Sequence, residues 1–223
     1  MPRVVVFDVN ETLLDLSALD AEFEAAFGSA AVRREWFTQV LQSAMTVTLS
    51  GLYRNFSEVG AAALSMVAER HGVSLSQGSR RAIAEGMRRL PPHPEVPAAL
   101  RRLREAGLTL AALTNSPDEV MEAQLAHAGL SPLFAHRISV DGARALKPAL
   151  AVYRHAAQRL QVPTTGMLMV AAHGWDLAGA MSAGCGTAFV ARPGQILDRL
   201  FPEPEIVGRD LGEVAEAILE VEV

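Results

Sequence analysis

The sequence contains a single cysteine, few aromatic residues and no segment in which basic charge is concentrated. The lone thiol, Cys185, cannot form an intramolecular disulfide, so we expect a buried core residue in a protein of the reducing cytoplasm. The net charge of -5 and the dispersed arginines give no electrostatic basis for binding nucleic acid. The apolar run at residues 4–7 is too short for a signal peptide or a membrane-spanning helix. We therefore expect neither a nucleic-acid nor a membrane partner.

Lysine is almost absent as well. Of the 20 basic residues, 19 are arginine, and Lys147 is the only lysine. Arginine carries a planar, permanently charged fork, whereas lysine carries a compact ammonium that fits against one carboxylate and shares protons with it. Composition alone leaves chance retention equally open, so the position of Lys147 in the fold decides whether it is functional.

Hydrophobic residues are abundant, and they occur in short runs that alternate with helical stretches. They make up 50% of the 223 residues, enough for one large domain or for a core domain with a smaller insert. The predicted strands are residues 4–7, 108–113, 137–140, 167–171 and 187–191. The predicted helices that accompany them are residues 95–105, 117–127, 149–160 and 176–183. This alternation predicts a parallel sheet with right-handed crossovers.

The first predicted strand is followed by helices only. Four helical stretches come before the second strand, at residues 19–27, 31–49, 57–71 and 77–88. A proline-rich segment at residues 90–97 then returns the chain to the alternating pattern. We therefore predict an α/β fold with a doubly wound, Rossmann-like parallel sheet core at residues 1–14 and 93–223. An all-helical cap is inserted at residues 15–92.

Polar residues follow the predicted strands at the edge where ligands bind in open parallel sheets. Asp8 comes after the first strand, and Thr114 and Asn115 come after the second. Lys147 and Asp176 belong to the loops after the third and fourth strands. Each residue alone is more simply a turn or cap residue, but together they suit covalent catalysis by aspartate. In that chemistry Asp8 attacks the substrate, and Lys147 keeps its carboxylate ionised.

Four motifs and two segments of the predicted cap carry a family resemblance. The motifs are FDVNETLLD, ALTNS, ALKP and VAAHGWDLAGA, and the cap segments are WFTQVLQSAM and YRNF. They resemble the haloacid dehalogenase superfamily, in particular its type II 2-haloacid dehalogenases, along the whole chain. The resemblance implies hydrolytic dehalogenation of short 2-haloalkanoic acids, in which Asp8 displaces the halide to form an ester that water hydrolyses to a 2-hydroxy acid. It further implies a small carboxylate substrate and no required metal or other cofactor, and it leaves a homodimer open.

The resemblance also indicates individual site residues. The catalytic positions are Asp8, Thr12, Asn115, Lys147 and Asp176, among which Asn115 helps to receive the leaving halide. We expect the substrate-binding residues to be Asn10, Phe37, Leu41, Phe56, Thr114, Tyr153, His173 and Trp175. Several of these form an apolar wall, and a dry pocket strengthens a carboxylate as a nucleophile.

Three positions depart from that family. Phe37 stands where the dehalogenases commonly have an arginine that faces the substrate. Arg33 and Arg34 lie four and three residues earlier on the same helix, which leaves open that one of them reaches over the same face, but we expect both to be solvated. Ala171 and His173 stand where a serine and an asparagine are usual. His173 is suited to positioning water or to donating to an anion, and its titration near neutral pH would make turnover sensitive to pH.

Asn10 separates the dehalogenase interpretation from its alternatives. Phosphatases of the superfamily carry a second aspartate two residues after the nucleophile, where it protonates the leaving alcohol. Asn10 has no such proton to give, whereas a leaving halide needs none. Two alternatives stay open: a magnesium-dependent phosphohydrolase that tolerates Asn10, and a catalytically degenerate member that binds a small anion.

Overall fold

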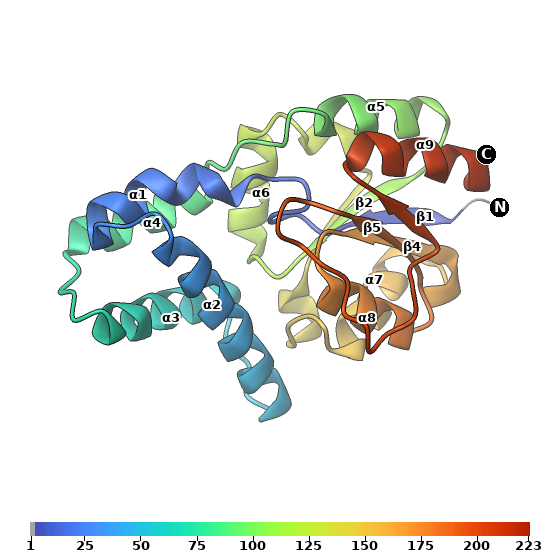
Figure 1. The fold of residues 1–223 in the computed structure, drawn as a ribbon. Coiled ribbons are helices and arrows are strands. Elements are labelled where there is room, and N and C mark those ends of the chain that lie inside the picture. The colour runs from blue at the N-terminus through green and yellow to red at the C-terminus, as the bar shows by residue number, and fades with distance from the viewer. Residues whose placement is uncertain (1–2) are drawn as a thin grey trace.

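A six-stranded parallel sheet forms the centre of the computed structural model, which describes residues 3–223 (Figure 1). The strands are β1 (Val4–Phe7), β2 (Leu110–Thr114), β3 (His136–Ser139), β4 (Met167–Ala171), β5 (Gly186–Val190) and β6 (Ile206–Gly208). Their order across the sheet is β3-β2-β1-β4-β5-β6, so β1 and β4 occupy its middle. The doubly wound, Rossmann-like α/β fold expected from the alternating pattern is confirmed.

Helices cover both faces of this sheet. One face carries α5 (Val96–Glu105) and α9 (Leu211–Glu222) side by side, and the opposite face carries α7 (Leu150–Leu160) and α8 (Gly174–Ser182) (Figure 1). The connection from β2 to β3 contains α6 (Asp118–His127). Within residues 3–223, no helix combines the length and the apolar character needed to cross a membrane.

Four further helices separate β1 from α5. They are α1 (Asp20–Phe27), α2 (Val32–Leu49), α3 (Phe56–Arg70) and α4 (Gln77–Met87). They pack mainly on one another and lie beside the sheet, as Figure 1 shows. Aromatic packing joins the first two helices, since the rings of Phe23 and Trp36 have centroids 5.2 Å apart. The third helix begins after Asn55, whose side chain accepts the N–H of Glu58 in a reciprocal capping box.

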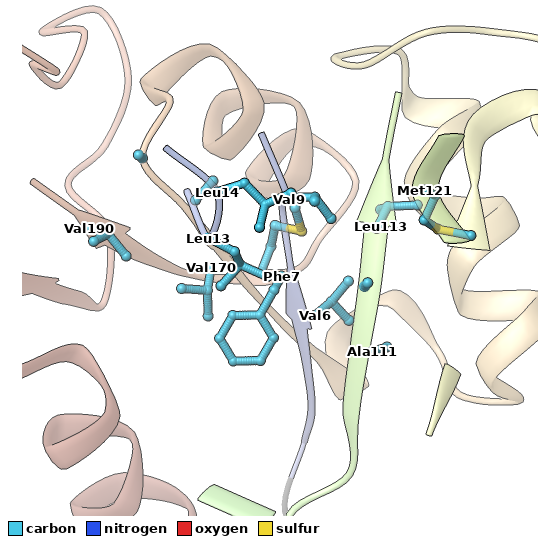
Figure 2. Packing of buried hydrophobic residues seen from close by; sticks show 14 of the residues in the cluster. Val6, Phe7, Val9, Leu13, Leu14, Ala111, Leu113, Met121, Val170 and Val190 are labelled. Atoms are coloured by element: carbon cyan, nitrogen blue, oxygen red, sulfur yellow. The ribbon is translucent and has the colours of Figure 1, made fainter. Parts of the chain in front are cut away.

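The core lies where the central strands meet the helices on both faces. Val5, Val6 and Phe7 of β1 are completely buried, and so is every residue of β4. Strands covered on both faces have no solvent-facing side, which explains their unbroken apolar sequence. Figure 2 shows part of this packing, with Leu13 of the following loop close to β1. The loop that follows Phe7 is thus anchored by apolar side chains on a rigid central strand.

Two elements at the C-terminal end were missed by the sequence analysis, namely β6 and α9. The strand has only three residues and pairs with β5, so it has no recognisable alternation of its own. The remaining short elements are 3-10 helices in the connections: η1 (Leu16–Leu19), η2 (Ser131–Leu133), η3 (Val140–Ala143) and η4 (Thr164–Gly166).

Cys185 precedes β5 and is buried, as predicted. Burial raises the pKa of its thiol to about 12, and the negative charge of Asp176 acts in the same direction. The side chain is therefore a neutral thiol at any pH near neutrality.

Candidate active site

The loops after β1 and β4 are tied together beside Asp8. The N–H of Asp8 donates to the carbonyl of Val170 at 3.0 Å, which fixes the start of the first loop against the neighbouring strand. The hydroxyl of Thr12 donates to Oδ2 of Asp8 at 2.6 Å and accepts the N–H of Ala172 at 2.9 Å. Thr12 therefore holds the carboxylate and joins the two loops at once.

The ammonium of Lys147 lies between two carboxylates. Its Nζ is 3.1 Å from Oδ1 of Asp8 and 2.8 Å from Oδ2 of Asp176, and all three side chains are buried. Burial alone would raise the pKa of Asp8, but the charge of Lys147, followed by that of His173, holds it well below its ordinary value. Burial would lower the pKa of Lys147, but the two carboxylates raise it instead. Asp8 is thus an ionised carboxylate beside a permanent cation.

Asp176 is fixed by Tyr153 as well as by Lys147. The phenol of Tyr153 lies 2.6 Å from Oδ1 of Asp176, and both side chains are completely buried. Burial raises the pKa of Asp176 in spite of the opposing charge of Lys147. Tyr153, which we expected to bind substrate, is placed behind Asp176, where it supports the ion pair.

The imidazole of His173 is held between Asp8 and Glu11. Its Nε2 is 2.8 Å from Oε2 of Glu11, and its Nδ1 is 3.4 Å from Oδ2 of Asp8. Burial would lower the pKa of His173, but the two carboxylates raise it to about 9. The ring packs between the aromatic rings of Trp175 and Phe37, with centroid distances of 5.1 Å and 6.1 Å. His173 is therefore an imidazolium at neutral pH, within reach of the carboxylate of Asp8.

Two cavities flank this group of residues. The first has a volume of about 580 Å³ and is lined by Glu11, His173, Phe37, Leu41 and Trp175 together with several charged side chains. The second has a volume of about 260 Å³ and a mainly apolar wall that includes Phe37, Phe56, Ile83 and Met87. Phe37 borders both cavities. Asp8 itself lines neither cavity, but its neighbour His173 lines the first, and 8% of the side-chain surface of Asp8 is accessible.

The remaining predicted polar residues bind the neighbouring loops. Thr114 accepts the N–H of Ser116 at 3.1 Å, and Asn115 accepts the N–H of Lys147 at 2.9 Å. Asn10 donates to the hydroxyl of Ser116 at 3.2 Å. The contacts of Asn10 and Asn115 hold the loop after β2 against the loops after β1 and β3, and none of the three contacts reaches the carboxylate of Asp8.

Arg33 corrects one expectation. The side chain is buried rather than solvated, because its Nε pairs with Oδ1 of Asp20 at 2.5 Å on the preceding helix. Its Nη1 also approaches Oε1 of Glu11 at 4.0 Å, and the residue lines the larger cavity. Arg34, its neighbour on the same helix, is exposed as expected.

Two charged residues of the site were missed by the sequence analysis. Glu11 has a left-handed backbone with φ of 61°, which turns its side chain toward His173. Arg192, just after β5, is buried and donates from Nη2 to the carbonyl of Thr12 at 2.9 Å. Its Nη1 pairs with Glu95 at 2.6 Å. A motif containing a glutamate between Asn10 and Thr12 offered a signal for the first, but the sequence contained none for the second.

The donor set does not fit a divalent cation that bridges Asp8 and Asp176. The ammonium of Lys147 already lies between these carboxylates, in contact with both. Across residues 3–223, no group of three or more His, Cys, Asp or Glu side chains is arranged to hold a metal ion.

Comparisons with known proteins agree with this geometry. A family model described as haloacid dehalogenase-like hydrolase matches residues 2–184. The chain belongs to the haloacid dehalogenase-like hydrolase family. It is 31% identical over 218 residues to an (S)-2-haloacid dehalogenase of Pseudomonas putida, a match that covers 97% of each chain. A haloacetate dehalogenase of Moraxella sp. (strain B) is 32% identical over 205 residues, covering 91% of this chain and 92% of the relative.

A solved structure of the same family extends the comparison to the fold. The L-2-haloacid dehalogenase of Xanthobacter autotrophicus, solved with chloropropionic acid covalently bound, superposes with a TM-score of 0.91. It is 26% identical in sequence, and the match covers 98% of both chains. The resemblance that the four motifs indicated is thus confirmed, and the protein is a hydrolase of this family.

Proposed function

We propose that the protein hydrolyses the carbon–halogen bond of short 2-haloalkanoic acids through an ester on Asp8. One observation carries this proposal: Asp8 is buried, ionised and held by Lys147, and the adjacent His173 lines a cavity with aromatic residues in its wall. A desolvated carboxylate is a stronger nucleophile toward carbon than one in water. The names of the relatives in Pseudomonas putida and Moraxella, both dehalogenases, support the same reaction.

In the first step a carboxylate oxygen of Asp8 attacks the α-carbon of the substrate. The new carbon–oxygen bond forms as the carbon–halogen bond breaks, and the halide leaves with the electron pair. Thr12 and Lys147 hold the carboxylate in place during the attack. No proton is required by the leaving halide, which agrees with an amide at Asn10.

The carboxylate of the substrate needs a positive partner, and Arg33 is the residue we propose for it. Arg33 lines the larger cavity together with Phe37 and Leu41, on the same helix. It takes over the binding that an arginine at position 37 would supply. A buried guanidinium suits this role because it presents several donors to a planar carboxylate.

In the second step water attacks the carbonyl carbon of the Asp8 ester. The bond between that carbon and the ester oxygen breaks, so this oxygen leaves in the 2-hydroxy acid. The oxygen of water replaces it in the restored carboxylate of Asp8. Residues 15–92 serve as a cap over a core of residues 1–14 and 93–223. Phe37 and Leu41 of the cap and Trp175 of the core line one cavity, which supports this division.

The proposal is tested by measuring chloride release from (S)-2-chloropropionate, alongside phosphate release from p-nitrophenyl phosphate with and without magnesium. We expect chloride release only, and its loss in the Asp8→Asn variant. A single turnover in heavy-oxygen water should place the label first in Asp8, because solvent attacks the enzyme ester. Phosphate release without chloride release, or label found first in the product, would overturn the proposal.

A further inference from the structure

The two nitrogens of His173 are in different situations. Nε2 is bonded to the carboxylate of Glu11 at 2.8 Å. Nδ1 faces Oδ2 of Asp8 at 3.4 Å, is buried, and has no hydrogen-bond partner within residues 3–223. An ionised carboxylate only accepts hydrogen bonds, so Glu11 keeps a hydrogen on Nε2 whether the ring is charged or neutral. When His173 is neutral, its free lone pair is therefore on Nδ1, next to Asp8.

We propose that His173, held by Glu11, is the general base that activates water for hydrolysis of the Asp8 ester. Formation of the ester favours the neutral imidazole that can act as this base. The inference rests on the proposed function, because it concerns the second step of that reaction. The imidazole is in the position that a base requires, since it borders the larger cavity and its Nδ1 faces the carboxyl group of Asp8, which water attacks in the ester.

The charge of Asp8 controls the protonation of His173. Beside the ionised Asp8 and Glu11, the pKa of His173 is raised to about 9, so the resting ring is a cation. Alkylation converts Asp8 into a neutral ester and removes one of those two negative charges. Burial, which opposes the charged ring, is then balanced by Glu11 alone, and the pKa falls. The other charged or titratable residues that line the same cavity are Asp15, Arg33, Arg34, His93 and Arg192.

The two ionisable groups that join Asp8 in the ion pair, Asp176 and Lys147, have no comparable free position. Oδ1 of Asp176 accepts the phenol of Tyr153, and Oδ2 accepts the ammonium of Lys147. Lys147 is itself protonated, because two carboxylates raise its pKa. Ala171, at the end of β4, has no hydroxyl to orient water. His173 is thus the group near Asp8 with an unengaged nitrogen.

The protons balance over one turnover. After ester formation, the imidazolium of His173 releases its proton to solvent through the cavity. Nδ1 then takes a proton from the attacking water as the new carbon–oxygen bond forms. On collapse of the tetrahedral intermediate, His173 returns that proton to the departing 2-hydroxy acid oxygen. The newly formed carboxyl of Asp8 gives its own proton to His173, so the ion pair is restored and one proton per halide has entered the solvent.

The decisive experiment uses His173→Gln with (S)-2-chloropropionate in a rapid-quench assay. We expect a burst of about one chloride per active site, followed by a steady-state rate that is lower by roughly 10²- to 10⁴-fold. Mass spectrometry of the intact protein should show the covalent adduct accumulating on Asp8. Because only folded enzyme gives the burst, its amplitude also reports on folding. His127→Gln, on the exposed end of α6, serves as the matched control and should show neither burst nor adduct.

A second measurement follows the pH dependence of ester hydrolysis in single turnovers. In the wild-type enzyme the rate should rise with pH and level off, with an inflection below pH 9. In Glu11→Gln the imidazole loses its remaining negative neighbour, so the inflection should move down by about 1 unit or more.

Three results would overturn the inference. His173→Gln slowing the burst itself, with no adduct, would place His173 in the first step. Ester hydrolysis that does not change with pH would exclude a titrating base. A wild-type enzyme that releases no chloride at all would refute the proposed function and this inference with it, whereas the first two results leave the proposed function standing.

Discussion

The phenol of Tyr153 donates to Oδ1 of Asp176 at 2.6 Å, inside a region that water does not reach. The same carboxylate binds Lys147 through its other oxygen at 2.8 Å. Asp176 is therefore clamped on both oxygens, and this clamp fixes the direction in which the ammonium points. Tyr153 therefore acts on the ion pair indirectly: it holds Asp176, and Asp176 holds the ammonium of Lys147 that contacts Asp8.

Removal of the phenol hydroxyl in Tyr153→Phe should weaken both stability and turnover. A buried carboxylate oxygen loses its donor, which costs about 1 to 3 kcal/mol of unfolding free energy. We expect kcat for chloride release to fall about tenfold, the equivalent of about 1.4 kcal/mol, with little change in KM. The other tyrosine provides the control, because Tyr53 contacts Asp141 away from the ion pair. If Tyr53→Phe lowered kcat equally, the clamp would not be the cause.

The stability of the protein should fall between about pH 6.5 and about pH 9. His173 has a folded-state pKa of about 9, above the ordinary value of 6.5. A group with a raised pKa stabilises the fold fully below the unfolded value, and this contribution is lost as pH rises through the folded value. The loss is on the order of 3 kcal/mol. Urea unfolding at pH 6.5 and pH 9 should show this loss of unfolding free energy in the wild type and not in His173→Asn. Equal losses in the two proteins would contradict the assignment of the loss to His173.

Arg33→Gln and Arg34→Gln provide a matched pair on one helix. Both residues line the larger cavity, but only Arg33 is buried. If Arg33 binds the substrate carboxylate, its loss removes a charge-assisted hydrogen bond and should raise KM about tenfold or more, with kcat little changed. Arg34→Gln should change KM by less than about twofold, since an exposed cation is screened by solvent. Equal effects of the two substitutions would exclude Arg33 as the binding residue.

Phe37→Ala should widen the range of substrates. Phe37 borders both cavities, so its truncation joins them into one space. The ratio of kcat/KM for 2-chlorohexanoate to that for 2-chloropropionate should rise about tenfold or more, because each methylene in an apolar pocket is worth about 1 to 3 kcal/mol. The unfolding free energy should fall by about 3 kcal/mol. Leu41→Ala, which enlarges only the larger cavity, is the control, and the same change in the ratio there would argue against a separating role for Phe37.

Much of the fold could be predicted because the central strands are covered on both faces. Their apolar runs and the polar residues at their ends were visible in the sequence, and Asp8, Lys147 and Asp176 do meet in space. The last helix was missed although Asp210 caps it through the N–H of Glu213, a recognisable start signal. The short strand β6 had no such signal.

The contacts of charged side chains were much harder to predict. The sequence indicated that Arg33 was solvated, because a helix arginine usually is, and only the packing of α1 on α2 brings Asp20 next to it. Glu11 lies in a recognised motif, but it reaches His173 through a left-handed backbone, a conformation that a glutamate rarely adopts. Such pairs depend on how separate segments meet.

The buried thiol of Cys185 has a consequence for the proposed reaction with 2-haloacids. These compounds are alkylating agents, and they react with thiolates far more readily than with thiols. With a pKa of about 12 and little accessible surface, Cys185 offers them almost no thiolate. At its single cysteine, the protein is thereby protected from alkylation by the proposed substrates.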